Sequence, residues 1–314
     1  MRIVRGYSDV DPMDRGACAA IGNFDGVHLG HRSVIEQTRS TAADAGVPLG
    51  VVTFDPHPRS YFAPEAPAFR LMNAEAKEHR LAQIGVDNLY VLPFDAGLSG
   101  LEAEAFAAEV IAGGLGLSHV VVGADFCFGK GRKGTAEDLV RLGAEMGFET
   151  TIAPLLSINT EAGPVSSTRI RQALSDGAPR DARAMLGHWH RIEGPVIHGE
   201  KRGRTLGYPT ANLSLTGLHL PRFGVYAVTA EILNGPHTGS YSGVASLGVR
   251  PMFGENLPNL ETHLFDFSGD LYGAHLSVGL VEFLRPEQRF EGVAGLIAQM
   301  ARDSARARDC LATL

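Results

Sequence analysis

The sequence predicts an α/β domain with a doubly wound parallel sheet, followed by a small antiparallel β-barrel domain with a C-terminal helix. Up to about residue 153, short apolar runs alternate with helical patterns, which is typical of a parallel sheet covered by helices on both faces. After residue 187, apolar runs follow one another with glycine and proline turns between them, which is typical of a small barrel or sandwich. The length of 314 residues is enough for two hydrophobic cores.

In the first domain, strands are expected where short apolar runs occur, at 17–21, 49–54, 88–92, 119–122 and 149–153. Between these runs apolar residues recur at intervals of three and four, which predicts helices around 34–38 and over 74–84, 101–111 and 136–146. Glycines follow these helices where a left-handed residue ends a helix, at Gly46, Gly85, Gly116 and Gly147. A further helix is expected over 166–174, with a turn at 175–177.

In the second domain, the expected strands are 190–198, 208–213, 225–233, 240–247, 261–267 and 276–283, and an amphipathic helix over 293–311 closes the chain. The boundary is expected within 178–189, where Pro179 and Gly187 interrupt the pattern. The predicted domains are therefore 1–186 and 187–314.

Composition restricts the class of protein. Apolar residues make up 44% of the chain and charged residues 20%, as in soluble globular proteins. A net charge of −7 gives no general attraction to nucleic acid or to an anionic membrane, so neither is expected as a partner. The three cysteines, Cys18, Cys127 and Cys310, are too far apart for a C-x-x-C metal site or a disulfide framework. Because no signal peptide or membrane span is evident, we expect a cytoplasmic protein. A monomer or weak homo-oligomer is also expected.

The decapeptide GNFDGVHLGH, residues 22–31, directly follows the first expected strand. Ligands of doubly wound sheets bind at the carboxyl ends of strands, and phosphates bind at helix N-termini. Gly22 and Gly26 would let the chain turn sharply, and Gly30 would let a nucleotide approach the backbone. His28 and His31, at i and i+3, share one face of the first helical turn and could donate hydrogen bonds to a nucleoside triphosphate. Ordinary surface histidines and a zinc pair are the alternatives.

This decapeptide resembles the H-x-G-H signature of nucleotidylyltransferases, in the form found in bacterial bifunctional riboflavin kinase/FAD synthetases. Further blocks of that family occur in the expected order: TFDPHP at 53–58, VVGADFCFGKGRKG at 121–134, SSTRIRQAL at 166–174, HGEKRGRTLGYPTANL at 198–213, LPRFGVYAV at 220–228, LETHLFDFSGDLYG at 260–273 and LRPEQRF at 284–290. The resemblance covers nearly the whole chain. It implies a nucleotidylyltransferase domain that adenylylates FMN to FAD with release of pyrophosphate, and a barrel that phosphorylates riboflavin to FMN. ATP would be the co-substrate of both reactions, with Mg²⁺ as the metal.

For adenylyl transfer, Ser166, Ser167 and Thr168 precede a helix, and Arg171 follows one turn later. Hydroxyls and a guanidinium at this spacing favour phosphate binding, although a simple helix cap is the alternative. The resemblance implies that this segment and the two histidines hold the triphosphate from opposite sides. The FMN phosphate is already an anion, so it can attack the α-phosphorus of ATP without a protein base. The expected ATP-binding set also includes Gly22, Phe24, Asp25 and Gly30, with a turn-stabilising role open for Asp25.

The expected flavin site lies near the rigid segment Pro56, His57 and Pro58, which would form a wall for a flat ring. Phe62, Phe126 and Phe128 could pack against the isoalloxazine, although buried aromatic residues more often belong to the core. The resemblance places flavin near this segment and also near Asp125 and Phe128.

For the kinase reaction, Thr210 and Asn212 would point to the same side of a strand, and both carry oxygen atoms suited to Mg²⁺ bridging ATP phosphates. The resemblance implies that Gly203 joins this ATP site. It also implies that Glu261 accepts the proton of the ribityl 5′-hydroxyl, a poor nucleophile that benefits from a base. A structural salt bridge is the alternative for Glu261.

The chain departs from the family pattern in one block. Where family members commonly read A-N-I-G-x-R-P-T-F-G, this chain has Ser246 and Met252 in place of asparagine and threonine. Polar groups are thereby lost near the expected kinase site. The alternative function is a monofunctional FMN adenylyltransferase whose barrel only binds flavin. A flavin-sensing regulator or a nucleic-acid binder that uses the basic cluster 201–204 would be a protein of another class.

Overall fold

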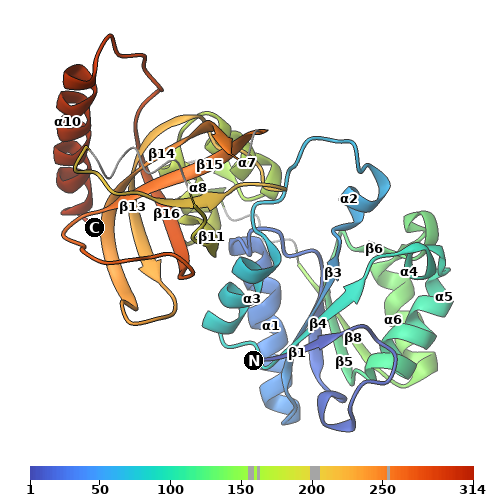
Figure 1. The fold of residues 1–314 in the computed structure, drawn as a ribbon. Coiled ribbons are helices and arrows are strands. Elements are labelled where there is room, and N and C mark those ends of the chain that lie inside the picture. The colour runs from blue at the N-terminus through green and yellow to red at the C-terminus, as the bar shows by residue number, and fades with distance from the viewer. Residues whose placement is uncertain (155–158, 161–162, 199–205, 253–254) are drawn as a thin grey trace. The chain divides into compact units, whose positions relative to one another are not determined.

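The fold is given by a computed structural model (Figure 1), which describes residues 1–154, 159–160, 163–198, 206–252 and 255–314. The chain divides into two compact units. Unit 1 comprises Met1–Ala66 and Lys77–Ile158, and unit 2 comprises Pro67–Ala76 and Asn159–Leu314. The sequence-based boundary between residues 186 and 187 stays a prediction.

Unit 1 is built on a six-stranded parallel sheet. Its strands, in spatial order, are β1 (Arg2–Arg5), β4 (Asn88–Pro93), β3 (Leu49–Asp55), β2 (Cys18–Ile21), β5 (His119–Gly123) and β8 (Glu149–Ala153). The expected strands and the doubly wound order are confirmed. The sequence analysis missed β1, an edge strand whose residues RIVR form no apolar run. The strand order reverses between β2 and β5, and ligands of such sheets bind at that point.

The connections of unit 1 are mainly helical. Figure 1 shows α1 and α3 on one side of this sheet and α5 and α6 on the other. The elements are η1 (Pro12–Asp14), α1 (Leu29–Ala45), α2 (Pro58–Phe62), α3 (Ala74–Gln83), α4 (Ala96–Gly100), α5 (Ala103–Ala105), η2 (Phe106–Leu115), η3 (Lys130–Arg132) and α6 (Ala136–Met146), with a ribbon of β6 (Cys127–Phe128) and β7 (Gly134–Thr135). The segment expected as one helix over 101–111 is α5 continued by the π-helix η2. The four glycines expected after helices all have a positive φ.

Unit 2 contains a six-stranded antiparallel sheet that curls into a nearly closed barrel. Its strands, in spatial order, are β11 (His190–Pro195), β16 (His275–Arg285), β13 (Gly224–Ile232), β14 (Gly239–Met252), β15 (Glu255–Leu264) and β12 (Ala211–Ser214). The edge strands β11 and β12 approach each other where the N–H of Ile197 donates to the carbonyl of Asn212 at 2.9 Å. A short ribbon, β9 (Asn159–Thr160) and β10 (Gly163–Pro164), also belongs to this unit. The expected barrel is confirmed.

The helices in the described part of unit 2 are α7 (Ser167–Ser175), α8 (Pro179–Leu186) and α10 (Val293–Leu311). The segment 178–189, expected as an interruption between domains, contains α8. Pro179 lies in the first turn of α8, where proline's missing N–H is not needed, and Gly187 ends the helix with φ 75°. Both residues therefore delimit a helix rather than break one. Among the described residues, no helix has the length and apolar character needed to cross a membrane.

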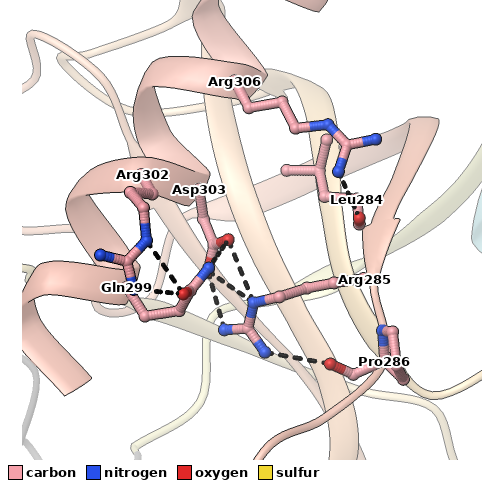
Figure 2. A network of polar contacts seen from close by, with 7 residues as sticks. All are labelled: Leu284, Arg285, Pro286, Gln299, Arg302, Asp303 and Arg306. Atoms are coloured by element: carbon pink, nitrogen blue, oxygen red, sulfur yellow. Dashed lines mark hydrogen bonds and ion pairs between the residues drawn. The ribbon is translucent and has the colours of Figure 1, made fainter. Parts of the chain in front are cut away.

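Helix α10 covers part of the outer face of the barrel. Ala307 is buried against Val225, Ala227 and Leu284. Figure 2 shows the polar anchor beside this contact: Arg285 of β16 donates to the carboxylate of Asp303 through Nε and Nη2 at 2.7–3.0 Å. The sheet thus holds α10 through both apolar and charged contacts.

Candidate active sites

The turn from β2 into α1 fixes the protonation of one of the two histidines. His28 is the N-cap of α1, and its Nδ1 accepts a hydrogen bond from the backbone N–H of His31 at 3.2 Å. Because Nδ1 is the acceptor, it carries no hydrogen, and the proton of the neutral ring is on Nε2. His28 therefore has an N–H donor on the opposite edge of its ring.

The two imidazole rings lie against each other, which confirms that they share one helix face. Their centroids are 3.6 Å apart with an interplanar angle of 11°, and the ring of Phe24 meets His31 edge-on at 5.3 Å. Burial holds the pKa of His31 well below its usual value, and His28 and Lys77 lower it further. Nδ1 of His31 has no hydrogen-bond partner among the residues that the structure describes. At neutral pH the pair therefore offers hydrogen-bond donors rather than positive charge.

The glycines of this turn serve two different purposes. Gly26 has φ 86°, a conformation that favours glycine, as expected for a sharp turn. A Cβ on Gly22 would lie 3.3 Å from the ring of Phe24, and one on Gly30 would lie 3.2 Å from the ring of His28. The structure thus gives Gly22 and Gly30 a role that the sequence did not suggest, which is to make room for rings of the same turn. Their part in ATP binding stays a prediction, as does that of the buried Asp25.

Lys77 is a residue of this site that the sequence analysis missed. Its Nζ donates to the carbonyl of Asn23 at 2.9 Å and to Oγ1 of Thr53 at 3.2 Å. The ammonium thereby joins the end of β3 to the turn that carries the histidines, and it is the cation that acts on His31. No motif singles out a lysine inside an amphipathic helix, so only the tertiary contacts reveal it.

The expected flavin wall follows β3. His57 caps α2, its Nδ1 accepting the N–H of Arg59 at 3.0 Å, and lies between Pro56 and Pro58. Phe62, at the end of α2, is 68% exposed, and its ring meets Phe94 at 5.7 Å. An exposed aromatic ring is available to a flat ligand.

The second expected flavin segment follows β5. Asp125 is exposed, whereas Phe128 is only 6% exposed and packs against Phe106 and Phe126 in the core of unit 1. Of the two interpretations left open for Phe128, this position favours the structural one, and its contact with flavin stays a prediction.

The hydroxyl-rich segment caps α7. The side chain of Ser166 accepts the N–H of Arg169 at 3.3 Å, and Ser167 and Thr168 form the first turn. Nε of Arg171 donates to the carbonyl of Phe69 at 2.6 Å, and the guanidinium lies over the Phe69 ring at 5.2 Å. By its contacts α7 belongs to unit 2. The expectation that this segment and the histidine pair hold one triphosphate stays a prediction.

The expected kinase residues lie in one row across the barrel. In the strand register, Glu261 of β15 is directly opposite Asn212 of β12 on one side and Ser246 of β14 on the other. The neighbours of these residues along each strand, Leu213, Leu260 and Leu247, belong to the barrel core, so the row lies on the outer face. The structure thus brings together the expected base, one expected metal ligand and one of the two departures from the family pattern. Gly203 and the side chain of Met252 lie outside the described residues.

The donor set beside Glu261 fits a hard cation. Asn212 is 6% exposed, and its Oδ1 accepts from Nδ2 of Asn259 at 3.1 Å. Thr210 directly precedes β12, held near it where Nδ1 of His263 donates to the carbonyl of Pro209 at 2.9 Å. Within the described ranges no three His, Cys, Asp or Glu side chains gather as a metal site. Hydroxyl and amide oxygens supplemented by substrate phosphates are the ligands that Mg²⁺ commonly takes in ATP sites.

Comparison with known proteins agrees with this pairing of sites. The FAD synthetase family model matches residues 10–169, and the riboflavin kinase family model matches residues 186–311. The bifunctional riboflavin kinase/FMN adenylyltransferase of Pseudomonas fluorescens is 40% identical, with 98% of this chain and 97% of that protein covered. The protein of the same description from Escherichia coli K12 is 38% identical, with the same coverage. A crystal structure described as a macrolide-efflux protein from Streptococcus pneumoniae has a TM-score of 0.82 and 33% identity, and covers 98% of this chain and 99% of that one. The chain belongs to the family of bifunctional riboflavin kinase/FMN adenylyltransferases.

Proposed function

We propose that this chain makes FAD from riboflavin in two ATP-dependent steps, phosphorylation to FMN and then adenylylation of FMN with release of pyrophosphate. The observation that carries this proposal is that both family models match one chain, at 10–169 and 186–311. The alternative of a monofunctional adenylyltransferase is not favoured, because the riboflavin kinase match spans the barrel and because Glu261 and Asn212 lie directly opposite each other in it.

In the kinase step, the half-buried carboxylate of Glu261 accepts the proton of the ribityl 5′-hydroxyl as that oxygen attacks the γ-phosphorus of ATP, whose bond to the bridging oxygen breaks to release ADP. Asn212 and Thr210 would hold a magnesium ion, which would neutralise charge on the ATP phosphates. Asn259 fixes the orientation of the Asn212 amide by donating a hydrogen bond to its Oδ1.

In the adenylylation step, the phosphate of FMN is the nucleophile and needs no base. Nε2–H of His28 and the neutral ring of His31 donate hydrogen bonds to phosphate oxygens of ATP. Since neither ring is charged, other residues must supply the positive charge that balances the ATP phosphates. We assign this role to Lys77 and Arg171. The exposed ring of Phe62 holds the isoalloxazine in place.

We also propose a cytoplasmic protein without nucleic-acid or membrane partners, working as a monomer or weak homo-oligomer. The net charge of −7 supports the expectation of no nucleic-acid or membrane partner, because it opposes association with polyanionic surfaces.

Chromatography of the products formed from riboflavin, ATP and Mg²⁺ tests the scheme, with FMN expected first and FAD later. Glu261→Gln should abolish FMN formation while added FMN is still adenylylated, and Glu282→Gln, a strand glutamate paired with Arg180, is the matched control. His31→Ala should lower adenylylation by about 10²–10³ and leave the kinase intact, with His79→Ala, a half-buried histidine whose ring bonds Gln83, as control. Unchanged kinase activity in Glu261→Gln, or unchanged adenylylation in His31→Ala, would contradict the assignment.

A further inference from the structure

The C-terminal turn of α7 is held by the segment that connects β12 to β13. Nε2 of His219 lies 3.0 Å from the carbonyl oxygen of Arg171 and 3.1 Å from Oγ of Ser175. A carbonyl oxygen only accepts, so Nε2 carries the hydrogen in this contact. His219 therefore donates to the backbone of the residue whose guanidinium we assign to the triphosphate.

The same connecting segment holds the end of α7 at a second point. The N–H of Arg222 donates to the carbonyl of Leu174 at 2.9 Å, and its Nη1 donates to the carbonyl of Asp176 at 3.3 Å. A Cβ on Gly177, which has φ 76°, would lie 2.9 Å from the Arg222 side chain. The last carbonyls of a helix lack partners within the helix, and here Arg222 of the barrel connection adds a donor to Leu174, which also accepts the N–H of Gly177.

A third segment of unit 2 fixes the direction of the Arg171 side chain. Phe69 accepts from Nε of Arg171 at 2.6 Å, and its own ring lies under the guanidinium. The next residue, Arg70, accepts the N–H of His219 through its carbonyl at 2.8 Å. Arg171 is thus held through its backbone by His219 and through its side chain by Phe69, and the two holding residues are linked through Arg70.

We propose that His219, which lies within the part matched by the riboflavin kinase family model, is a positioning residue for the adenylylation reaction. This proposal rests on the assigned role of Arg171. Alignment of ATP with the FMN phosphate is the main requirement of a reaction that needs no base, so a small rotation of α7 displaces the guanidinium and weakens ATP binding. The barrel thereby contributes to the second reaction as well as to the first.

The test compares His219→Ala with His219→Gln, whose amide N–H can reach the place of Nε2. His219→Ala should raise the KM for ATP in FMN adenylylation by about fivefold to tenfold, with the KM for FMN and the kinase activity unchanged. His219→Gln should restore most of the loss. His237→Ala is the matched control, since His237 is a barrel histidine whose ring contacts Phe267.

Three outcomes overturn the proposal: parental adenylylation by His219→Ala, an equal loss of both activities, or a glutamine variant as impaired as the alanine variant. Arg171→Ala, assayed in parallel, distinguishes a failure of this proposal from a failure of the role assigned to Arg171 in adenylylation. If Arg171→Ala keeps parental adenylylation, the role of Arg171 itself is wrong. If Arg171→Ala is impaired and His219→Ala is not, only the positioning role fails.

Discussion

The ion pair that anchors α10 allows a quantitative prediction for the variant Asp303→Asn. The side chains of Arg285 and Asp303 are only 14% and 8% exposed. Asp303 accepts from Nε and Nη2 of Arg285 and, at 2.8 Å, from Nε2 of Gln299 (Figure 2). Asparagine keeps the shape of the Asp303 side chain but removes its negative charge. It also replaces one carboxylate oxygen, which accepts hydrogen bonds, with an NH₂ group that faces the donors of Arg285 or Gln299. Breaking a buried pair in this way costs 3–5 kcal/mol, and the residual exposure of Arg285 places the expected loss of unfolding free energy near the lower end, at about 3 kcal/mol.

A second ion pair between α10 and the barrel provides the matched control. Asp266 also accepts from two nitrogens of one guanidinium, Nη1 and Nη2 of Arg308, at 2.8 and 2.9 Å, but these side chains are 78% and 50% exposed. Asp266→Asn should therefore change stability little, because surface pairs are screened by water. Asparagine also tolerates the positive φ of 55° at this position.

Urea unfolding followed by the fluorescence of Trp189, the single tryptophan of the chain, provides the assay. With a slope of about 2 kcal/mol per molar urea, Asp303→Asn should lower the midpoint by about 1.5 M. Replacing both partners, Arg285→Met with Asp303→Leu, should restore stability to near the parental value, because no uncompensated charge is then buried. Equal losses for Asp303→Asn and Asp266→Asn, or a double variant as unstable as the single one, would refute the reasoning.

Two further predictions concern pH and the kinase row. Burial lowers the pKa of His190 to about 3, with contributions from His188 and His219. Its unfolded form binds a proton near pH 6.5 and its folded form does not, so stability present above pH 6.5 is lost as the pH falls. Between pH 7 and pH 5 His190 should account for about 2 kcal/mol of this loss. Urea titrations at the two pH values should show a smaller loss for His190→Leu, and a parental pH dependence would contradict the prediction. Ser246→Ala removes a hydroxyl directly opposite Glu261 and should lower kcat/KM for riboflavin about threefold to tenfold, leaving adenylylation unchanged. Steady-state assays of both reactions provide the measurement. A loss of adenylylation, or an unchanged kcat/KM for riboflavin, would contradict the prediction.

Local signals in the sequence account for the elements that were predicted correctly. The apolar runs that became β2, β3, β4 and β5 are largely buried strands, and a buried strand shows its character in consecutive residues. Helix α8 was not predicted, because a proline begins a helix or interrupts one depending on its position. β1 escaped detection because an edge strand with two arginines has no apolar run.

The sequence by itself determined the two fold classes, the family and the residue types of both reactions, since periodicity and motifs are properties of neighbouring residues. Only the tertiary structure decided which distant residues meet. It brought Lys77 into hydrogen-bond contact with the turn that carries the histidines, and it placed Ser246 opposite Glu261. It also brought His219 into hydrogen-bond contact with the backbone of Arg171. The physical reason is that these contacts depend on strand register and on how separate segments pack, and neither leaves a periodic pattern along the chain.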